Sequence, residues 1–462
     1  MKRKNAWDTY DENDVKELEK INNEYKSCLD AGKTERECVT EAVRRAKAAG
    51  YRELNKVIKD GEKINPGTRL YSTWMEKSIV LFQIGEEPME NGMNILGAHI
   101  DSPRIDLKQM PLYEDQEFAY FDTHYYGGIK KYQWVAIPLA IHGVVVRTDG
   151  SKTEIVIGEK EDDPVFVISD LLVHLSKDQM DKKMGEAISG EKLDLLIANR
   201  PLTGEGKERV KDSVLKLLKE TYDIVEEDFL SAELEIVPSG KARDCGFDRS
   251  MIMGYGQDDR VCAFTSLFAI LEMEQVKRTA CCILVDKEEI GSVGATGMQS
   301  KFFENAVAEL ISGINGAGQY SELTLRRTLA NSKMLSSDVS AAYDPMYSEV
   351  FEKKNSAYFA NGIVFNKYTG SRGKSGSNDA NAEYVADIRR IMEDNKVVFQ
   401  TAELGKVDAG GGGTIAYILA SQGMNVIDSG VAVLSMHAPW EVTSKADIYE
   451  AVKCYRAFLK DA

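Results

Sequence analysis

The sequence predicts an α/β fold with a mostly parallel sheet, and two observations lead to this expectation. After Gly246, apolar runs that are typical of buried strands alternate with helical runs along the rest of the chain. Several of the expected strands end at a carboxylate or a histidine, and ligands bind parallel sheets at the carboxyl ends of their strands. We therefore expect helices on both faces of the sheet and a ligand site at one of its edges.

Between about Ile105 and Cys245 the pattern changes to many short β-like runs, with one helical stretch at residues 204–218. A chain of 462 residues exceeds the size of a domain with a single hydrophobic core. The chain on either side of this stretch carries the candidate ligands. We therefore predict one domain formed by residues 1–104 and 247–462, with residues 105–246 inserted into it as a second domain.

The individual elements follow from their hydrophobic periodicity. Residues 12–49 are predicted as two surface helices separated near Gly32, because Leu18, Ile21 and Tyr25 recur at helical spacing. In the rest of the predicted first domain, strands are expected at residues 78–83, 94–99, 281–285, 333–336, 357–365, 397–400 and 430–435, and helices at 261–273, 301–314, 379–394 and 414–422. In the insertion, strands are expected at residues 134–146, 154–157, 193–198 and 233–237.

Composition excludes several classes of partner. The 58 basic and 74 acidic residues give a net charge of −16, which argues against nucleic acid or an anionic membrane as the main partner. The longest apolar stretch, residues 134–146, is shorter than the roughly 20 residues that cross a bilayer. Acidic residues rather than an apolar segment follow the basic start at Met1, so we expect no signal peptide and a cytoplasmic protein. The seven cysteines include no Cys-x-x-Cys pair and are expected to be reduced and mostly buried.

Two strand ends carry residues suited to a metal site. The first strand end holds His99 and Asp101, a spacing in which an imidazole can bind a metal while the carboxylate orients the ring from behind. The second strand end, after the apolar run 281–285, holds Glu288 and Glu289. At the end of a strand both carboxylates can turn toward one cleft, where one holds a metal and the other moves a proton.

Three more candidate ligands stand at similar places. Asp258 lies at the start of an expected helix, where an ordinary helix cap is the simpler explanation, and Asp338 and His437 follow expected strands. Together with His99 and Glu289 they make a set of two imidazoles and three carboxylates without a thiolate. Such a set suits a pair of divalent ions such as zinc, cobalt or manganese. Spacing alone leaves open whether the five side chains converge.

The motifs stand in an order and spacing that resemble the M18 family of metallo-aminopeptidases, over nearly the whole chain. Within that family, the sequence is most similar to the branch of yeast aminopeptidase I and its bacterial relatives, and less similar to aspartyl aminopeptidase. The matching segments are Ala98-His99-Ile100-Asp101-Ser102-Pro103, Gln257-Asp258-Asp259-Arg260, Asp286-Lys287-Glu288-Glu289-Ile290-Gly291, Ser337-Asp338 and Leu434-Ser435-Met436-His437, with residues 31–37 and Tyr126-Gly127-Gly128.

The resemblance implies a phosphorylase/hydrolase-like catalytic domain with a mixed, mostly parallel sheet, interrupted by a β-rich dimerisation domain. It also implies two divalent metal ions per subunit, with zinc as the expected metal and cobalt or manganese as alternatives. The expected substrates are peptides. The expected assembly is a homo-oligomer, a tetrahedral dodecamer built from dimers.

The resemblance further assigns roles to individual residues. It implies that His99 and Asp338 hold one metal, that Glu289 and His437 hold the other, and that Asp258 bridges them. The peptide bond between Asp258 and Asp259 is expected to be cis. Asp101 would orient His99. Glu288 would be the general base that takes a proton from water and passes it to the leaving amine.

Substrate-binding residues are implied less directly. His174 resembles a histidine that this family projects from the dimerisation domain into the active site of a neighbouring subunit. A basic substrate-binding residue falls near Arg372 or Lys374. Aspartyl aminopeptidases carry a histidine shortly after the ligand aspartate, whereas Asp338 is followed by Val339-Ser340-Ala341-Ala342, so a preference for acidic substrates is not implied.

Two other functions remain compatible with the sequence. A di-metal deacylase or amidohydrolase acting on acylated amino acids could use the same ligands without needing a free amine. A non-catalytic, shell-forming assembly protein is the other alternative, although the full set of ligands and Glu288 argues against a vestigial site.

Overall fold

The computed structural model describes residues 4–316, 319–371 and 377–462. The chain divides into two compact units. The first unit comprises residues 1–101, 242–436 and 441–462, and the second comprises residues 102–241 together with residues 437–440. These changes between units fall close to the predicted limits at residues 104 and 246.

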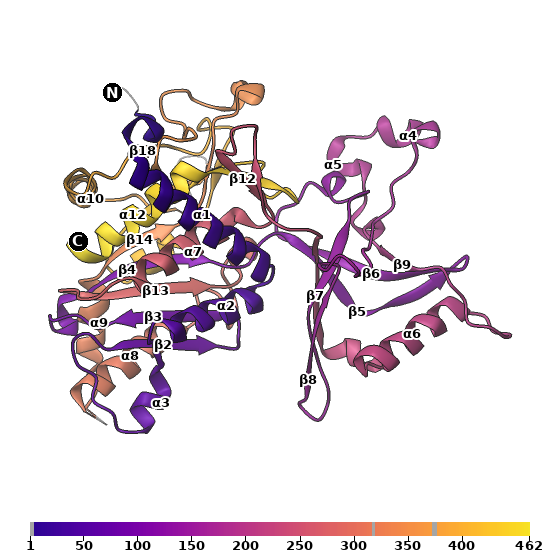
Figure 1. The fold of residues 1–462 in the computed structure, drawn as a ribbon, viewed down its shortest axis with the longest axis horizontal. Coiled ribbons are helices and arrows are strands. Elements are labelled where there is room, and N and C mark those ends of the chain that lie inside the picture. The colour runs from indigo at the N-terminus through magenta and orange to yellow at the C-terminus, as the bar shows by residue number, and fades with distance from the viewer. Residues whose placement is uncertain (1–3, 317–318, 372–376) are drawn as a thin grey trace. The chain divides into compact units, whose positions relative to one another are not determined.

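The first unit is built on a nine-stranded sheet (Figure 1). Five of the neighbouring strand pairs are parallel and three are antiparallel, so the sheet is mixed and mostly parallel, as predicted. In spatial order its strands are β1 (Arg52–Glu53), β2 (Arg69–Trp74), β3 (Ser78–Gln83), β13 (Thr279–Val285), β4 (Met93–His99), β14 (Lys333–Ser337), β20 (Asn425–Gly430), β16 (Ile363–Asn366) and β18 (Phe399–Thr401).

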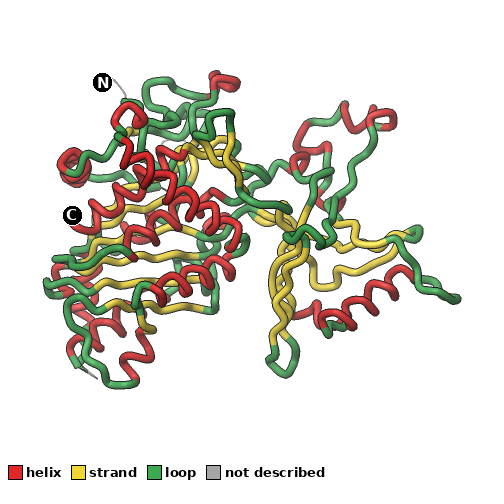
Figure 2. Tube along the Cα trace, viewed as in Figure 1, coloured by secondary structure: helices red, strands yellow, loops and turns green. Residues whose placement is uncertain are grey.

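Helices cover both faces of this sheet, and Figure 2 shows them in red beside the yellow strands. The helices of the first unit are α1 (Glu12–Ala31), α2 (Glu35–Ala48), α3 (Leu54–Lys59), α7 (Gln257–Leu271), α8 (Phe302–Asn315), α9 (Glu322–Ala330), α10 (Ala382–Asp394), α11 (Ala416–Ala420) and α12 (Lys445–Asp461). Residues of α1, α2, α7, α10 and α12 form one hydrophobic cluster with the sheet, and residues of α3, α8, α9 and α11 form another.

The packing of β13 on both of its faces explains why its sequence is one continuous apolar run. Ala280, Cys282 and Leu284 belong to the first hydrophobic cluster, whereas Cys281 and Ile283 belong to the second. Successive strand residues point to opposite faces, so a strand covered on both sides needs apolar residues at every position. The predicted two-sided cover is therefore confirmed.

The predicted helix pair is also confirmed, and its break has a local cause. Thr34 begins α2 with a capping box, in which the Glu37 amide donates to Thr34 Oγ1 (3.2 Å) and the Thr34 amide donates to Glu37 Oε2 (3.1 Å). Each bond satisfies an amide that has no partner inside the helix.

Two predicted strands and one predicted helix are wrong in extent. The strand predicted at residues 134–146 begins only at Leu139, because Ala136 has a φ of 59° and Pro138 has no amide hydrogen to donate. The strand predicted at 357–365 is confined to β16, because the chain turns at Ala360 and Gly362, both with positive φ, and Asp447 binds both of their amides. The insertion helix predicted at 204–218 is α6, Arg209–Tyr222.

The strand predicted at residues 430–435 is present but shorter, and it does not belong to the large sheet. The sheet strand is β20, which ends at Gly430, and a separate strand β21 (Ala432–Leu434) follows in another sheet. The polar residues of β20 hid it from the sequence pattern. One of them, Asp428, is buried and accepts a hydrogen bond from Thr414 (2.6 Å).

A smaller sheet completes the first unit together with the two-stranded ladder β17 (Gly370–Ser371) and β19 (Gly411–Gly412). In spatial order the strands of this five-stranded sheet are β11 (Arg243–Cys245), β12 (Met251–Gly254), β22 (Glu441–Ser444), β21 and β15 (Ser340–Ala341). All seven cysteines are unpaired thiols, and six of them are buried, as predicted. Among the described residues, no helix is long and apolar enough to cross a membrane.

The second unit is β-rich, with a six-stranded sheet whose neighbouring strands are all antiparallel. In spatial order its strands are β8 (Lys152–Ile157), β7 (Leu139–Val146), β10 (Ala232–Pro238), β5 (Arg104–Asp115), β6 (Phe118–Tyr126) and β9 (Leu195–Ala198). Its helices are α4 (Lys177–Met180), α5 (Met184–Ala187) and α6.

Candidate metal centre

Three neighbouring parallel strands bring three of the predicted ligands, together with Glu288, to one edge of the large sheet. Strand β4 ends at His99 and lies between β13 and β14, and it is parallel to both. Glu288 and Glu289 lie in a short 3-10 helix (Glu288–Ile290) after β13, and Asp338 directly follows β14. Because the carboxyl ends of parallel strands meet at the same edge, side chains separated by hundreds of residues converge there.

Asp258 reaches this edge by another route. It follows β12 of the five-stranded sheet and lies in the first turn of α7, so its predicted place at the start of a helix is confirmed. The peptide bond between Asp258 and Asp259 is cis, as predicted. The Asp258 amide donates to Glu441 Oε2 (3.1 Å), and the buried Gln257 amide group donates to the Glu441 main-chain oxygen (2.8 Å). Glu441 therefore fixes this turn, a role that the sequence did not indicate.

The two nitrogens of the buried His99 ring face different partners. Nδ1 lies 3.0 Å from the main-chain oxygen of Asp101 and 3.3 Å from its Oδ1. Nε2 lies 3.3 Å from Asp258 Oδ1 and 3.9 Å from Glu288 Oε2. A proton on Nδ1 is the arrangement that Asp101 favours, and it leaves the lone pair of Nε2 directed at the carboxylates, where a metal would bind.

Asp101 has a second function that the sequence did not reveal. Its Oδ1 accepts a hydrogen bond from the Glu288 amide (3.1 Å), and its Oδ2 accepts one from the Glu289 amide (3.2 Å). The same buried carboxylate therefore orients the His99 ring and holds the turn that carries both glutamates. Because it joins two strand ends, a change at Asp101 would displace His99, Glu288 and Glu289 together.

Two overlapping groups of side chains have the geometry of a cation site. Ligand atoms of His99, Asp258 and Asp338 lie within 4.8 Å of one another, and so do those of His99, Glu288 and Glu289. Nitrogen and oxygen donors at this spacing, without sulfur, suit zinc and other divalent ions of intermediate hardness.

Electrostatics favours a cation in the same place. The side chain of Asp338 is partly buried, and its pKa is raised well above the usual value by burial and then by the negative charges of Asp259, Glu288 and Asp258, although His99 opposes the shift. Burial likewise raises the pKa of Asp259. Burial lowers the pKa of His99, but its hydrogen bonds to Asp101 and Asp258 outweigh this and raise it overall. Carboxylates that repel one another so strongly need a positive charge between them to ionise together.

His437 belongs to the second unit and follows a strand, as predicted, but this strand is β21 of the five-stranded sheet and not a strand of the large sheet. Within its unit, His437 Nδ1 lies 2.8 Å from the main-chain oxygen of Gly128. A proton on Nδ1 would donate to that oxygen, leaving Nε2 as the nitrogen for a metal. His437 has a φ of 65°, an uncommon conformation for a residue with a side chain that tends to occur at functional sites. The motif Tyr126-Gly127-Gly128 therefore supplies the main-chain oxygen that faces the His437 ring.

The remaining predicted residues are distributed as follows. His174 lies in an exposed 3-10 turn of the second unit, Val173–Leu175. Arg372 and Lys374 lie outside the described residues. His142 is buried with Nε2 3.1 Å from Glu159, and His124 is exposed, so neither belongs to the candidate site.

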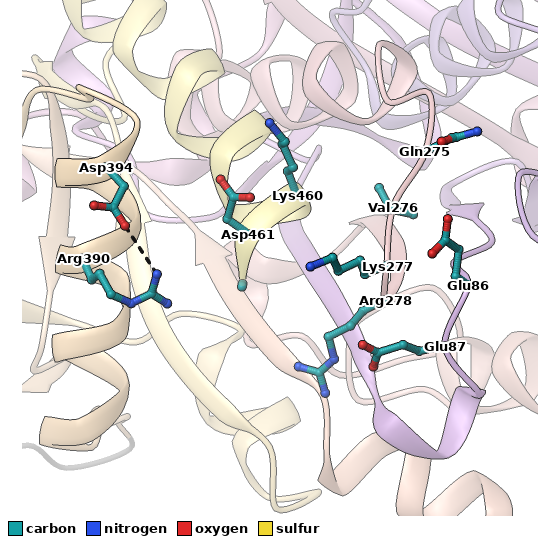
Figure 3. Close-up of a pocket in the computed structure, with 11 residues that line it drawn as sticks. Glu86, Glu87, Gln275, Val276, Lys277, Arg278, Arg390, Asp394, Lys460 and Asp461 are labelled. Atoms are coloured by element: carbon teal, nitrogen blue, oxygen red, sulfur yellow. Dashed lines mark hydrogen bonds and ion pairs between the residues drawn. The ribbon is translucent and has the colours of Figure 1, made fainter.

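A cavity of about 690 Å³ lies elsewhere in the first unit, beside the amino ends of β4 and β13 (Figure 3). Both cationic and anionic side chains line it, and one pair, Arg390 and Asp394, is in contact at 3.5 Å. None of the described residues that line this cavity is a histidine or a predicted ligand. The candidate site is therefore at the opposite ends of the strands.

Comparison with known proteins gives a consistent result. Residues 28–459 match the model of the family described as aminopeptidase I zinc metalloprotease (M18). The chain is 60% identical over 459 residues to a probable M18 family aminopeptidase 1 of Clostridium acetobutylicum, covering 99% of this chain and 98% of the relative. It is similar to the crystal structure of aminopeptidase I from C. acetobutylicum (58% identity, TM-score 0.93, 100% and 99% of the chains). It is also similar to that of an M18 aminopeptidase from Thermotoga maritima (44% identity, TM-score 0.95, 100% of both chains).

Proposed function

The chain belongs to the M18 family of zinc metalloproteases, and from this premise we propose that it is an aminopeptidase that removes the N-terminal residue of peptides with water activated at two divalent metal ions. The observation that supports the proposal most strongly is the convergence of His99, Asp258 and Asp338 beside the Glu288–Glu289 turn. The family description names zinc, and the donor set suits it.

The proposed ligands follow the sequence assignment. His99 and Asp338 would hold one ion, Glu289 and His437 would hold the other, and Asp258 would be a ligand of both. Asp101 and Gly128 act behind the two imidazoles, since each faces a ring Nδ1. When bound, the two ions supply a water with a pKa near about 7 and polarise the scissile carbonyl group.

Glu288 is the proposed general base. Its amide is held by Asp101 and its carboxylate lies 3.9 Å from His99 Nε2, so the group is fixed beside the proposed metal position. Only 17% of the side chain is exposed. The carboxylate takes a proton from the attacking water and passes it to the nitrogen of the leaving amine. The negative charge of the site would also hold the free α-ammonium group of the substrate, which restricts cleavage to the first residue.

The test compares substrates with and without a free amine. We expect aminoacyl-p-nitroanilides to be cleaved and their N-acetylated counterparts to be left intact, because acetylation removes the charge that the site recognises. A chelator should abolish cleavage, and added zinc, cobalt or manganese should restore it. Cleavage of the acetylated substrates would favour the deacylase alternative, and no cleavage of either would favour a non-catalytic assembly protein.

A homo-oligomer, as a tetrahedral dodecamer of dimers in the cytoplasm, is part of the proposal. It is supported by a cluster of exposed apolar side chains around His174 in the second unit. Monomers rarely expose such clusters, which usually mark an interface. The exposed residues are Leu171, Leu172, Val173, Leu175, Met180 and Met184, with exposures from 47% to 75%. In this assembly His174 reaches the active site of a neighbouring subunit and contacts substrate there.

His174→Ala should lower kcat/KM by roughly tenfold to hundredfold, the cost of losing a hydrogen bond to a charged group. If His174 acts in the neighbouring subunit, a mixture with Glu288→Gln should regain activity, since some sites then combine an intact Glu288 with an intact His174. Random pairing restores about one quarter of the sites. The measurement is the specific activity of co-expressed, doubly tagged oligomers. Mixed oligomers as inactive as either parent would rule out a role in trans.

A further inference from the structure

The second unit contains a cavity of about 550 Å³, within the usual range for sites that bind small molecules. It is lined by Tyr125, Gly127, Gly128, Ile129, Lys130, Lys131, Tyr132, Met184 and Gly185. Two of these described lining residues are lysines and none is acidic. This cavity is separate from the one in Figure 3, whose lining mixes both charges.

Gly128 connects this cavity to the proposed active site. It lines the cavity, and its main-chain oxygen lies 2.8 Å from Nδ1 of His437. A Cβ atom at position 128 would lie 3.4 Å from the same nitrogen, which is an ordinary van der Waals contact, so the His437 ring packs directly against this turn. The turn that contacts His437 therefore also forms part of the cavity wall.

Contacts of Arg104 hold the start of the turn that forms the cavity wall beside His437. Tyr126 ends β6 and pairs with Arg104 at the start of β5. The buried guanidinium group of Arg104 lies over the Tyr126 ring, 3.9 Å from its centroid, and its Nε lies 2.8 Å from Asp106 and 3.2 Å from Glu235. This cation–π contact and the two ion pairs hold the start of the Gly127–Gly128 turn, so the site needs little reorganisation to accept a ligand.

The charge of the cavity lining favours an anionic ligand. Lys130 and Lys131 form no ion pair with any described residue, whereas the chain as a whole carries a net charge of −16. Two uncompensated ammonium groups in an acidic protein favour an anion. They would repel the α-ammonium group of a peptide. The anion that every peptide substrate carries is its C-terminal carboxylate, and it lies on the leaving side of the scissile bond.

We infer that Lys130 and Lys131 bind the C-terminal carboxylate of short peptides in this cavity, so that the enzyme prefers peptides with a free C-terminus a few residues beyond the scissile bond. The inference rests on the proposed aminopeptidase function and adds a substrate class to it. An acidic side chain on the first residue offers the same carboxylate chemistry, so the experiment must separate the two sources.

The experiment measures kcat/KM for Leu-Ala-Ala and for Leu-Ala-Ala amide, which differ only in the terminal charge. The wild type should prefer the free acid by about tenfold, the effect of a charged hydrogen bond. Lys130→Met/Lys131→Met should abolish the preference, and Lys130→Arg/Lys131→Arg should retain it. The single Met variants provide the same comparison if the double variant does not fold. Lys216→Met/Lys219→Met, which removes two exposed charges from α6, should leave the ratio of acid to amide unchanged.

Other outcomes would overturn the inference in distinct ways. Equal rates for acid and amide in the wild type would exclude a carboxylate subsite. If the lysine variants instead lose activity on Glu-Ala amide relative to Leu-Ala amide, the lysines bind the first side chain and the assignment is wrong. Leucine p-nitroanilide, which has no peptide beyond the scissile bond, tests the aminopeptidase function by itself. If the wild type cleaves this substrate but does not prefer Leu-Ala-Ala over its amide, the carboxylate subsite is rejected and the aminopeptidase function is retained.

Discussion

Replacing Glu288 with glutamine should lower kcat on leucine p-nitroanilide by about 10²- to 10⁴-fold, the usual contribution of a general base. The glutamine keeps the size of the side chain and the amide that donates to Asp101. It cannot accept the proton of the attacking water. Metal content, measured by mass spectrometry of the purified protein, should stay at the wild-type level because Glu288 is not one of the proposed ligands.

The control for this prediction is Glu309→Gln, which makes the same change on the exposed face of α8 and should leave both kcat and metal content unchanged. Loss of metal from the Glu288 variant would contradict the assignment. It would mean that Glu288 is a ligand, and the roles of the two adjacent glutamates would have to be exchanged. Full activity with a full metal content would exclude Glu288 as the base.

The sequence predicted the central part of the large sheet well, because those strands are buried on both faces. Strands β3, β13 and β14 are each marked by a short apolar or small-residue run, and their positions follow from it. Strand β20 was not predicted from its sequence because it carries polar side chains such as Asp428. The hydrogen bond between Thr414 and Asp428 forms only in the folded chain. Sequence periodicity reports burial of apolar groups and does not detect buried polar groups that are satisfied.

The candidate site was predictable as a set of residues but not as a geometry. His99, Asp258 and Asp338 were chosen by residue type and position, and the structure brings them together. The place of Asp101 behind His99 was predicted, but its hydrogen bonds to amides 187 and 188 residues away were not, nor was the contact of Gly128 with a histidine 309 residues away. Only the tertiary fold determines which backbone groups face these side chains. Sequence motifs therefore locate ligands more readily than the groups that orient them.

Asp338→Asn should abolish activity and at the same time stabilise the metal-free protein. Asparagine is a poorer ligand than a carboxylate. Loss of a group that orients a ligand already weakens metal binding by about 10- to 100-fold, so loss of a ligand should cost at least as much. Without metal, however, the same change removes a carboxylate whose ionised form is disfavoured by burial and by the charges of Asp259, Glu288 and Asp258. Catalysis and stability therefore respond in opposite directions.

The pH dependence gives the sign of this effect. Because the pKa of Asp338 is raised in the folded state, its contribution to stability is fully present below the unfolded value of about 4 and is lost as pH rises through the folded pKa. The pKa of His99 is also raised, and its contribution is likewise lost as pH rises. The metal-free wild type should therefore melt at a lower temperature at pH 8 than at pH 5.

The measurement is the thermal midpoint of chelated protein from pH 5 to pH 8, with and without added zinc. Asp338→Asn should melt above the wild type at pH 8 and show a weaker dependence on pH. Zinc should flatten the wild-type curve, because a cation among the carboxylates allows them to ionise without repulsion. Asp60→Asn, an exposed site after α3, makes the same change in charge and should follow the wild type. If the Asp338 variant melted below the wild type without metal, that carboxylate would instead stabilise the fold, and the argument that its charge requires a metal would fail.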